Sequence, residues 1–456
     1  MTAPRTFEDT LTDWLRADAP AHAPGDILAI TISNVARIGQ QRGLMWRLGA
    51  RETRVRRLAL IAGLVALAVV GAAVVAGALQ STPEPIDATG AFVPGPDRAV
   101  GRGGGSATVV LNGRVLVVGG ESEAGVCIAP EDSVEIWSPD GSRGFDLGHP
   151  LSEARTGHSA TRLRDGRVLI VGGYCYTDEG LTLRQTAEVW DPATGEWTAA
   201  GTLTVPRSGH TAVLLNDGRV LIAGGTGPDG PDTKPIESLE VWDPVSSTFE
   251  QAGTTRDQRF GDGAALLPDG RVLLVGDTGA QLWDPSTMKV VAAGTLREPR
   301  YFSTVTSLLD GRVAVIGGLW GSDADMLMRS SIETWNPATG SFRVAGWMND
   351  PRTRATATVL PDGRVLIVGG SEVDFSAEVW DPSTGLASRT GPSRRIYNGA
   401  TATLLDDGRV LFTAGVGPFG KAGRHTELWD PTINPPPPGL GPPQPTPTPK
   451  PQQVGG

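Results

Sequence analysis

The chain has few of the side chains on which most catalytic and metal sites depend. Its 456 residues include only two cysteines and five histidines, and no histidine pair has a zinc-binding spacing. No phosphate-binding glycine loop, calcium-binding loop or serine–histidine–aspartate order is recognisable either. The sequence therefore predicts no metal and no other cofactor, and it makes an enzyme the less favoured class of function.

Basic residues are scarce in the larger part of the chain. Residues 1–57 carry nine arginines and six acidic residues, whereas residues 58–456 carry 31 basic and 44 acidic residues, a net charge of −13. Proteins that bind nucleic acid need clustered Lys or Arg to neutralise phosphates. We therefore expect no nucleic acid among the partners of this acidic part.

One long apolar run is present, at residues 58–79. It has 22 residues without a charge, and as a helix it would be roughly 33 Å long, enough to cross a hydrocarbon core of about 30 Å. A cleaved signal peptide is one alternative, because Ala76-Gly-Ala78 resembles a cleavage site, and a buried core helix is another. However, a signal peptide has a short leader, and 57 residues precede this run. We predict a retained, single transmembrane helix.

The arginines closest to this run all precede it. Seven lie between positions 37 and 57, and the next basic residue after the run is Arg98. The positive-inside rule then places residues 1–57 in the cytoplasm and the rest of the chain outside the plasma membrane. Apolar spacing at 6–17 and 26–38 predicts two short helices in the cytoplasmic segment. Residues 80–87 are predicted to be a linker, and the proline-rich residues 434–456 are predicted to be a disordered, extended tail.

Residues 88–433 contain a sequence repeat. A Gly-Arg-Val triplet recurs at spacings of 53, 52, 52, 41, 52 and 45 residues, and an apolar run follows each triplet. The triplets begin at Gly113, Gly166, Gly218, Gly270, Gly311, Gly363 and Gly408. Each is followed by a Trp-x-Pro, at Trp137, Trp190, Trp242, Trp283, Trp335, Trp380 and Trp429. A repeat of this length is one supersecondary unit copied seven times.

Each unit is predicted to contain four antiparallel strands. In residues 155–203, strand-like runs at 157–163 and 167–171 flank an Asp-Gly turn, which is a strong hairpin signal because such turns use positive φ angles. A third strand ends at Trp190, and residues 191–195 turn the chain into a fourth. A single unit cannot bury both faces, so neighbouring units must stack.

These motifs resemble the kelch repeat: an arginine opens the first strand, a glycine pair ends the second, and an aromatic-Asp-Pro ends the third. The resemblance covers residues 88–433 and implies an all-β, seven-bladed β-propeller. Two units depart from it, with Gly276-Asp277 and Ala414-Gly415 in place of the glycine pair. The excess of arginine over lysine, 36 to 4, and the many Ala and Gly suggest a bacterial source. Kelch propellers serve many unrelated functions, so the fold does not give the function.

Closure of the ring is predicted to involve both ends of the repeat region. After Trp429 the chain reads Asn434-Pro-Pro-Pro-Pro438, which cannot be a fourth strand because proline lacks the N–H donor. The segment Ala88-Thr-Gly-Ala-Phe92 instead matches Ala193-Thr-Gly-Glu-Trp197. We predict that the strand around residues 90–93 completes the last blade.

The two cysteines lie in equivalent loops of neighbouring units. Cys127 and Cys175 each fall between the second and third strands, in blades 1 and 2. Outside the cell such a pair can be oxidised, and we predict that Cys127 and Cys175 form a disulfide. Two independent free thiols are the alternative.

An arginine recurs eleven residues before the turn glycine of each unit. The positions hold Arg102, Arg155, Arg207, Arg259, Arg300 and Arg352, with Tyr397 in the seventh. One interpretation is an electropositive ring at the channel that attracts a ligand. The other is that each guanidinium fixes a turn or a contact between blades.

Three residues after these arginines, the repeat is broken by a polar arc. His158, His210, Asp262 and Ser303 stand in consecutive blades, opposite Gly105, Ala355 and Ala400. In kelch propellers that bind ligands, this end of the innermost strands contributes to the pocket. We therefore predict a ligand site at this arc and at Arg155, Arg207, Arg259 and Arg300, with histidines that titrate between about pH 5 and 8. The alternative site is the set of long loops at 121–132, 174–185, 226–238 and 320–330.

Two classes of function remain beside an enzyme. The first is a membrane-anchored, extracytoplasmic module that binds a protein or a glycan. The second is a transmembrane sensor in which residues 1–57 report ligand binding. Among enzymes, some kelch-fold oxidases hold copper and cross-link a tyrosine to a cysteine, and Tyr174-Cys175-Tyr176 invites that comparison. The copper motif of those oxidases cannot be matched residue by residue.

Overall fold

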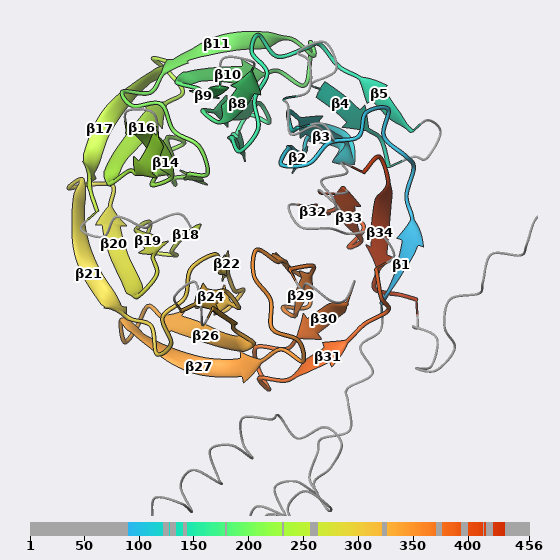
Figure 1. Ribbon diagram of the computed structural model, residues 1–456, viewed down its shortest axis with the longest axis vertical. Coiled ribbons are helices and arrows are strands. Elements are labelled where there is room, and N and C mark those ends of the chain that lie inside the picture. Colours follow the sequence, from blue (N-terminus) through green and yellow to red (C-terminus); the bar gives the residue numbers. More distant parts are fainter. Residues whose placement is uncertain are drawn as a thin grey trace, which may run out of the picture. The chain divides into compact units, whose positions relative to one another are not determined.

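A computed structural model describes most of residues 90–433, which belong to the compact unit Glu84–Gly456 (Figure 1). The short segments 122–126, 128–133, 140–143, 178–179, 230–231, 256–262, 322–325, 371–375, 394–399, 414 and 416–422 are not described. The predicted N-terminal helices, membrane span, linker and proline-rich tail also lie outside the described residues. Within the described part, no helix is both long and apolar enough to span a bilayer.

The described strands form seven four-stranded antiparallel sheets arranged around a central channel, as predicted for a seven-bladed propeller (Figure 1). The innermost strands are β2 (Ser106–Val109), β6 (Ser159–Arg162), β12 (Thr211–Leu214), β18 (Gly263–Leu266), β22 (Thr304–Ser307), β28 (Thr356–Val359) and β32 (Thr401–Leu404). The second strands are β3 (Val115–Val118), β7 (Val168–Val171), β13 (Val220–Ala223), β19 (Val272–Val275), β23 (Val313–Ile316), β29 (Val365–Val368) and β33 (Val410–Thr413).

The outer half of each blade holds the third and fourth strands. The third strands are β4 (Val134–Trp137), β10 (Thr186–Trp190), β16 (Ser238–Asp243), β20 (Gly279–Asp284), β26 (Ser331–Asn336), β30 (Ala377–Trp380) and β34 (Thr426–Asp430). The outermost are β5 (Phe145–Leu147), β11 (Trp197–Thr202), β17 (Thr248–Thr254), β21 (Lys289–Thr295), β27 (Ser341–Trp347), β31 (Ala387–Arg389) and β1 (Ala91–Pro94). Three further hairpins stand beside the sheets: β8–β9 (Tyr174–Thr177, Gly180–Leu183), β14–β15 (Thr226–Asp229, Asp232–Pro235) and β24–β25 (Leu319–Trp320, Leu327–Met328).

The first hairpin turns differ from the expected geometry. In blade 1 both turn residues, Asn112 and Gly113, have positive φ, within the short 3₁₀ segment η2 (Leu111–Gly113). In blade 2 the turn is instead a three-residue loop, in which Leu163 pairs with the residue after Gly166 and only the glycine has positive φ. Asp165 there accepts hydrogen bonds from the backbone N–H and the side chain of the following arginine. The repeated Asp-Gly-Arg is therefore a closed turn with its own ion pair.

The ring closes as predicted. Strand β1 pairs antiparallel with β34, with Phe92 opposite Trp429 and Pro94 opposite Glu427. The N–H of Gly90 donates to the carbonyl of Ile433, 2.7 Å away. Strands from the two ends of the repeat region therefore share the last blade, so the ring has no unpaired edge at the point where it closes.

The core lies between neighbouring blades. The second strands read as continuous apolar runs because both of their faces are covered, and Val168–Val171 is fully buried. The third-strand tryptophans are at most 3% exposed. Trp242 packs with Leu169 and Val171 of the preceding blade, and its indole N–H donates to the carbonyl of Ala200 there. Each repeat therefore depends on packing against its neighbours for its stability.

Candidate functional site

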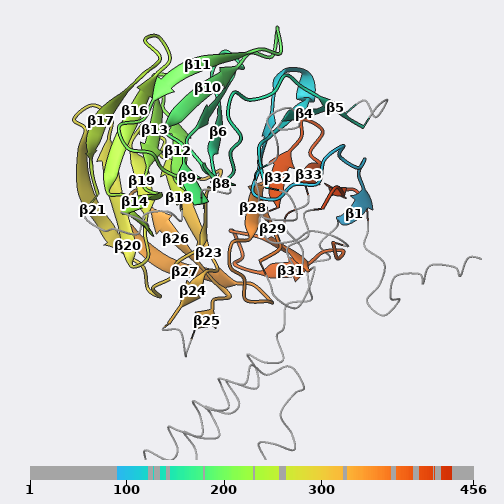
Figure 2. The same ribbon diagram turned by 45° about the horizontal axis from the view of Figure 1, so that its top comes forward.

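The two ends of the propeller differ in regularity. We call one the hairpin face: the innermost strands begin there, and it carries the hairpins β8–β9, β14–β15 and β24–β25 (Figure 2). The opposite end, the turn face, carries the repeated Asp-Gly turns. Backbone bridges such as Thr156 to Tyr174 and Tyr301 to Leu319 join each hairpin to the start of an innermost strand. The predicted arginine ring and polar arc both belong to the hairpin face.

The arginines of the predicted ring are buried within their own blades. Arg207 is 0% exposed, and one of its terminal nitrogens lies 2.6 Å from the carboxylate of Glu240, which is also 0% exposed. The guanidinium also donates to the carbonyls of Gly224 and Ser238. The same pattern joins Arg102 to Glu135, Arg155 to Glu188, Arg300 to Glu333, and Arg352 to Glu378. Arg259 lies outside the described residues.

The partner glutamate ties the blade to the chain segment that enters it. One carboxylate oxygen of Glu240 faces Arg207, and the other accepts the backbone N–H of Thr204, 2.8 Å away. These contacts are those expected if the arginines fix turns and blades, because the guanidinium charges are compensated inside the protein. The glutamate could have been found in the sequence, since it stands two residues before the Trp in six units, with Gln281 in the fourth.

The histidines of the predicted arc connect neighbouring blades. His158 Nε2 lies 2.9 Å from Ser106 Oγ, and His210 Nε2 lies 2.8 Å from Ser159 Oγ, each serine belonging to the preceding blade. Both rings pack closely against a glycine of that blade, because a Cβ on Gly119 would lie 2.7 Å from His158 Cε1. The Nδ1 atoms are buried with no hydrogen-bond partner among the described residues. Ser303 is 6% exposed, and Asp262 is not described.

Burial changes the titration of these histidines. Burial, followed by the positive charges of the nearby Arg155 and Arg207, lowers the pKa of both His158 and His210 to about 3. The expectation that they titrate between pH 5 and 8 is therefore wrong. The reason is that the neighbouring blade covers both rings, which the sequence does not reveal.

The structure contains the predicted disulfide between Cys127 and Cys175, with Cα atoms 5.5 Å apart. It joins the second-to-third strand loops of blades 1 and 2. Cys175 belongs to β8, next to Tyr174, whose ring lies over Gly157 at the start of an innermost strand. Among the described residues, no group of three or more His, Cys, Asp or Glu could hold a metal ion.

Sequence reasoning missed a second repeat-breaking position, two residues after each arginine. Glycine stands there in five units, while blades 5 and 6 carry Phe302 and Arg354. The backbone is left-handed at all five described positions: φ is 66° at Gly104, 62° at Gly157 and Gly209, 56° at Phe302, and 51° at Arg354. The sequence does contain a signal for this position. A glycine that recurs in most copies of a repeat indicates a backbone conformation that other residues adopt only with strain.

The residues at this position link the blades around the channel. The N–H of Gly209 donates to the carbonyl of Gly157, and the N–H of Arg354 donates to the carbonyl of Phe302, both at 2.9 Å. The Arg354 guanidinium carbon lies 3.9 Å above the centre of the Phe302 ring. Tyr301 contacts Phe302 edge to face and lies 6.2 Å from Trp320 of the β24–β25 hairpin, measured between ring centres.

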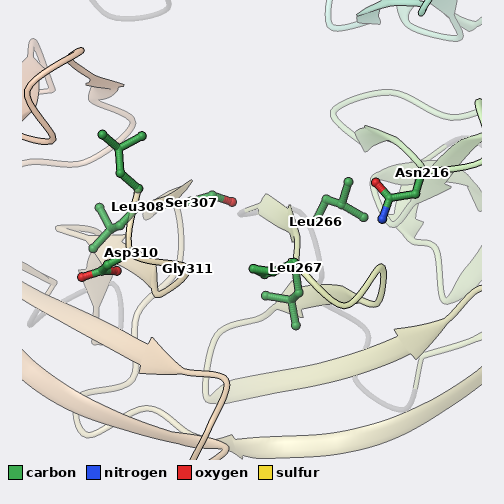
Figure 3. A pocket seen from close by; sticks show the side chains of 9 residues that line it. Asn216, Leu266, Leu267, Ser307, Leu308, Asp310 and Gly311 are labelled. Carbon is green, nitrogen blue, oxygen red and sulfur yellow. The ribbon is translucent and has the colours of Figure 1, made fainter.

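A cavity of about 470 Å³ lies on the turn face, between blades 4 and 5. Figure 3 shows Leu266 and Leu267 on one side and Leu308 and Asp310 on the other. The carboxylate of Asp310 is already paired with Arg312, at 2.6 Å. Leucine side chains and the polar Asn216, Ser307 and Asp310 together line this cavity, and it lies at the other end of the channel from the predicted arc.

No protein-family profile matches the chain. It is 27% identical over 146 residues to beta-scruin of Limulus polyphemus and 29% identical over 108 residues to an F-box/kelch-repeat protein of Arabidopsis thaliana. These matches cover 31% and 24% of this chain, but only 15% and 27% of those proteins.

A solved structure also resembles this fold. A fungal alcohol oxidase of the AA5 family, in complex with copper, has a TM-score of 0.58 and 19% identity, over 75% of this chain and 76% of that one. At this identity the likeness concerns the fold alone. Together with the two relatives, it supports a kelch-type propeller.

Proposed function

We propose that this kelch-type propeller is a membrane-tethered module that binds a protein partner on its hairpin face. The main observation behind this proposal is that the two ends of the propeller differ in regularity. On the turn face, the same Asp-Gly-Arg ion pair closes six of the seven first hairpins, as Asp217 and Arg219 illustrate. On the hairpin face, the blades differ in loop length, in added hairpins and in the residues around the channel. Binding surfaces are carried by such variable loops on a rigid scaffold.

The side chains of the hairpin face also suit a protein partner. Its added hairpins carry exposed apolar residues: Tyr176 is 49% exposed, Leu181 39%, Met326 45% and Leu327 62%. Aromatic side chains and Met are enriched at protein interfaces. A glycan remains the alternative ligand.

Oxidase chemistry of the cross-linked tyrosine type has little support in this chain. The Cys175 sulfur is bonded to Cys127, so it is not available for a thioether to Tyr174 or Tyr176. The fungal oxidase, at 19% identity, shares the fold alone. Protein binding is therefore the function that we favour.

The binding face can be tested by site-specific photo-crosslinking in the cells that make this chain. A benzophenone side chain at Leu327 should form a covalent adduct with a protein partner. The same group at Val245, which is 93% exposed on a turn of blade 3 at the turn face, is the matched control and should form none. Equal adducts at both positions, or none at Leu327, would rule out the hairpin face as the docking site.

The proposed membrane anchor, residues 58–79, can be tested separately. The full chain should remain with the membrane pellet after carbonate washing, and a variant lacking residues 58–79 should not, because the uncharged run is long enough to cross the bilayer. Protease added outside intact cells should remove the propeller and leave an N-terminal fragment. A protected propeller would contradict the predicted orientation.

A further inference from the structure

Phe302 and Arg354 have a left-handed backbone at a repeat position where the other described blades carry glycine. A side chain in this conformation brings its Cβ close to the backbone, which glycine does not. Five units have glycine at this position, so the fold itself does not require a side chain there. Strained residues that persist in an otherwise regular structure are candidates for function.

The strain places a guanidinium at the channel mouth in a fixed orientation. Arg354 is exposed, it stacks on Phe302 at 3.9 Å, and no carboxylate pairs with it among the described residues. Arg352, only two residues earlier, is instead buried against Glu378. A guanidinium that lies over an aromatic ring can present two parallel N–H groups, which match the two oxygens of a carboxylate.

The equivalent positions in the first three blades carry no side chain. Gly104, Gly157 and Gly209 stand there, and the Tyr174 ring packs over Gly157, whereas a Cβ on Gly209 would meet no atom within 4 Å. Among the described residues at this repeat position, Arg354 is thus the one that presents a charge.

We propose that Arg354 receives a carboxylate side chain from an acidic segment of the protein partner, with Phe302 holding the guanidinium in place. This inference rests on the proposed function and names the chemistry of its site. A peptide is favoured over an acidic sugar because Arg354 covers one face of Phe302, which reduces the open ring surface on which a sugar would stack. The propeller's net negative charge disfavours anions elsewhere, so binding should depend on this one arginine.

The experiment uses the full chain in nonionic detergent, with three soluble probes: capped hexaglutamate, capped hexaglutamine and hexagalacturonate. Titration calorimetry at low salt should show hexaglutamate binding at least about tenfold tighter than hexaglutamine, as expected for a charge-assisted pair. Arg354→Gln should remove that preference. Arg343→Gln, which deletes an exposed charge on the outer strand β27, is the matched control and should keep it.

A second variant separates binding from stability. Arg354→Gly restores the residue of most other blades, so it should abolish hexaglutamate binding while Tm stays the same or rises by up to about 3 °C. A fall in Tm of more than about 5 °C would show that the stacked pair is structural, and unchanged hexaglutamate binding in Arg354→Gln would exclude Arg354 as the anchor.

Tighter binding of hexagalacturonate than of hexaglutamate would replace the acidic peptide by an acidic glycan. If the Arg354→Gly variant still forms crosslinked adducts at Leu327, the hairpin face remains the proposed docking site, and only the role of Arg354 as carboxylate anchor is contradicted.

Discussion

Deleting residues 90–94 should prevent the propeller from closing. Strand β1 covers β34 along four residue pairs, and Phe92 packs on Trp429 and Phe412. Phe92 is half-buried, so its loss costs part of the about 3–5 kcal/mol of a fully buried Phe, and the loss of the four strand pairs adds to this. A domain is stabilised by only roughly 5–15 kcal/mol. The deletion also exposes the edge of β34, a template for aggregation. We expect insoluble or aggregated protein, measured by size-exclusion chromatography and by tryptophan fluorescence of the soluble fraction.

A permuted chain provides the rescue. Since Gly90 N lies 2.7 Å from Ile433 O, joining Ile433 directly to Gly90 gives blade 7 the same turn length as Trp190–Trp197 in blade 2. A chain in which residues 90–94 follow Ile433 should therefore regain the soluble monomer. If the deletion variant stays monomeric and keeps its Tm, β1 is not the closing strand.

A single substitution tests the same contact. Gly90 has a φ of 129°, and a Cβ there would lie 2.1 Å from the Trp429 ring. Gly90→Ala should therefore destabilise the ring, by about 1–3 kcal/mol from overpacking. Gly180→Ala is its control, because Gly180 has a φ of 110° but no atom within 4 Å of the added Cβ.

Arg207→Met should lower the free energy of unfolding by about 3–5 kcal/mol, because it leaves Glu240 buried without its charge partner. Both side chains are 0% exposed, and the substitution also removes donors from the carbonyls of Gly224 and Ser238. Chemical denaturation followed by tryptophan fluorescence measures the change.

Two further variants make this test specific. Arg219→Met breaks the half-exposed pair with Asp217 on the turn face, and it should cost about 0–1 kcal/mol. Adding Glu240→Gln to Arg207→Met should recover part of the loss, because a neutral amide is easier to bury than an unpaired carboxylate. Blade 4 already has Gln281 at the equivalent position. Equal losses for Arg207→Met and Arg219→Met would contradict the structural role of the buried arginine.

The sequence by itself determined the number of blades, their four-strand plan and the closing strand. Each of these follows from a local pattern repeated seven times: a turn, an apolar run and a Trp-x-Pro at nearly constant spacing. The match of residues 88–92 to the fourth strands was equally local. Such patterns predict the structure because every blade packs between two blades of the same kind.

Only the tertiary structure decided which polar side chains are available to a ligand. Arg207 and His210 stand out in the sequence, but Arg207 is compensated by Glu240 inside its own blade, and His210 is covered by Ser159 and Gly172 of the preceding blade. Burial and pairing depend on contacts between strands far apart in the chain, which spacing alone does not reveal. Phe302 and Arg354 break the repeat visibly, yet their left-handed backbone and their mutual stacking exist only in the folded ring.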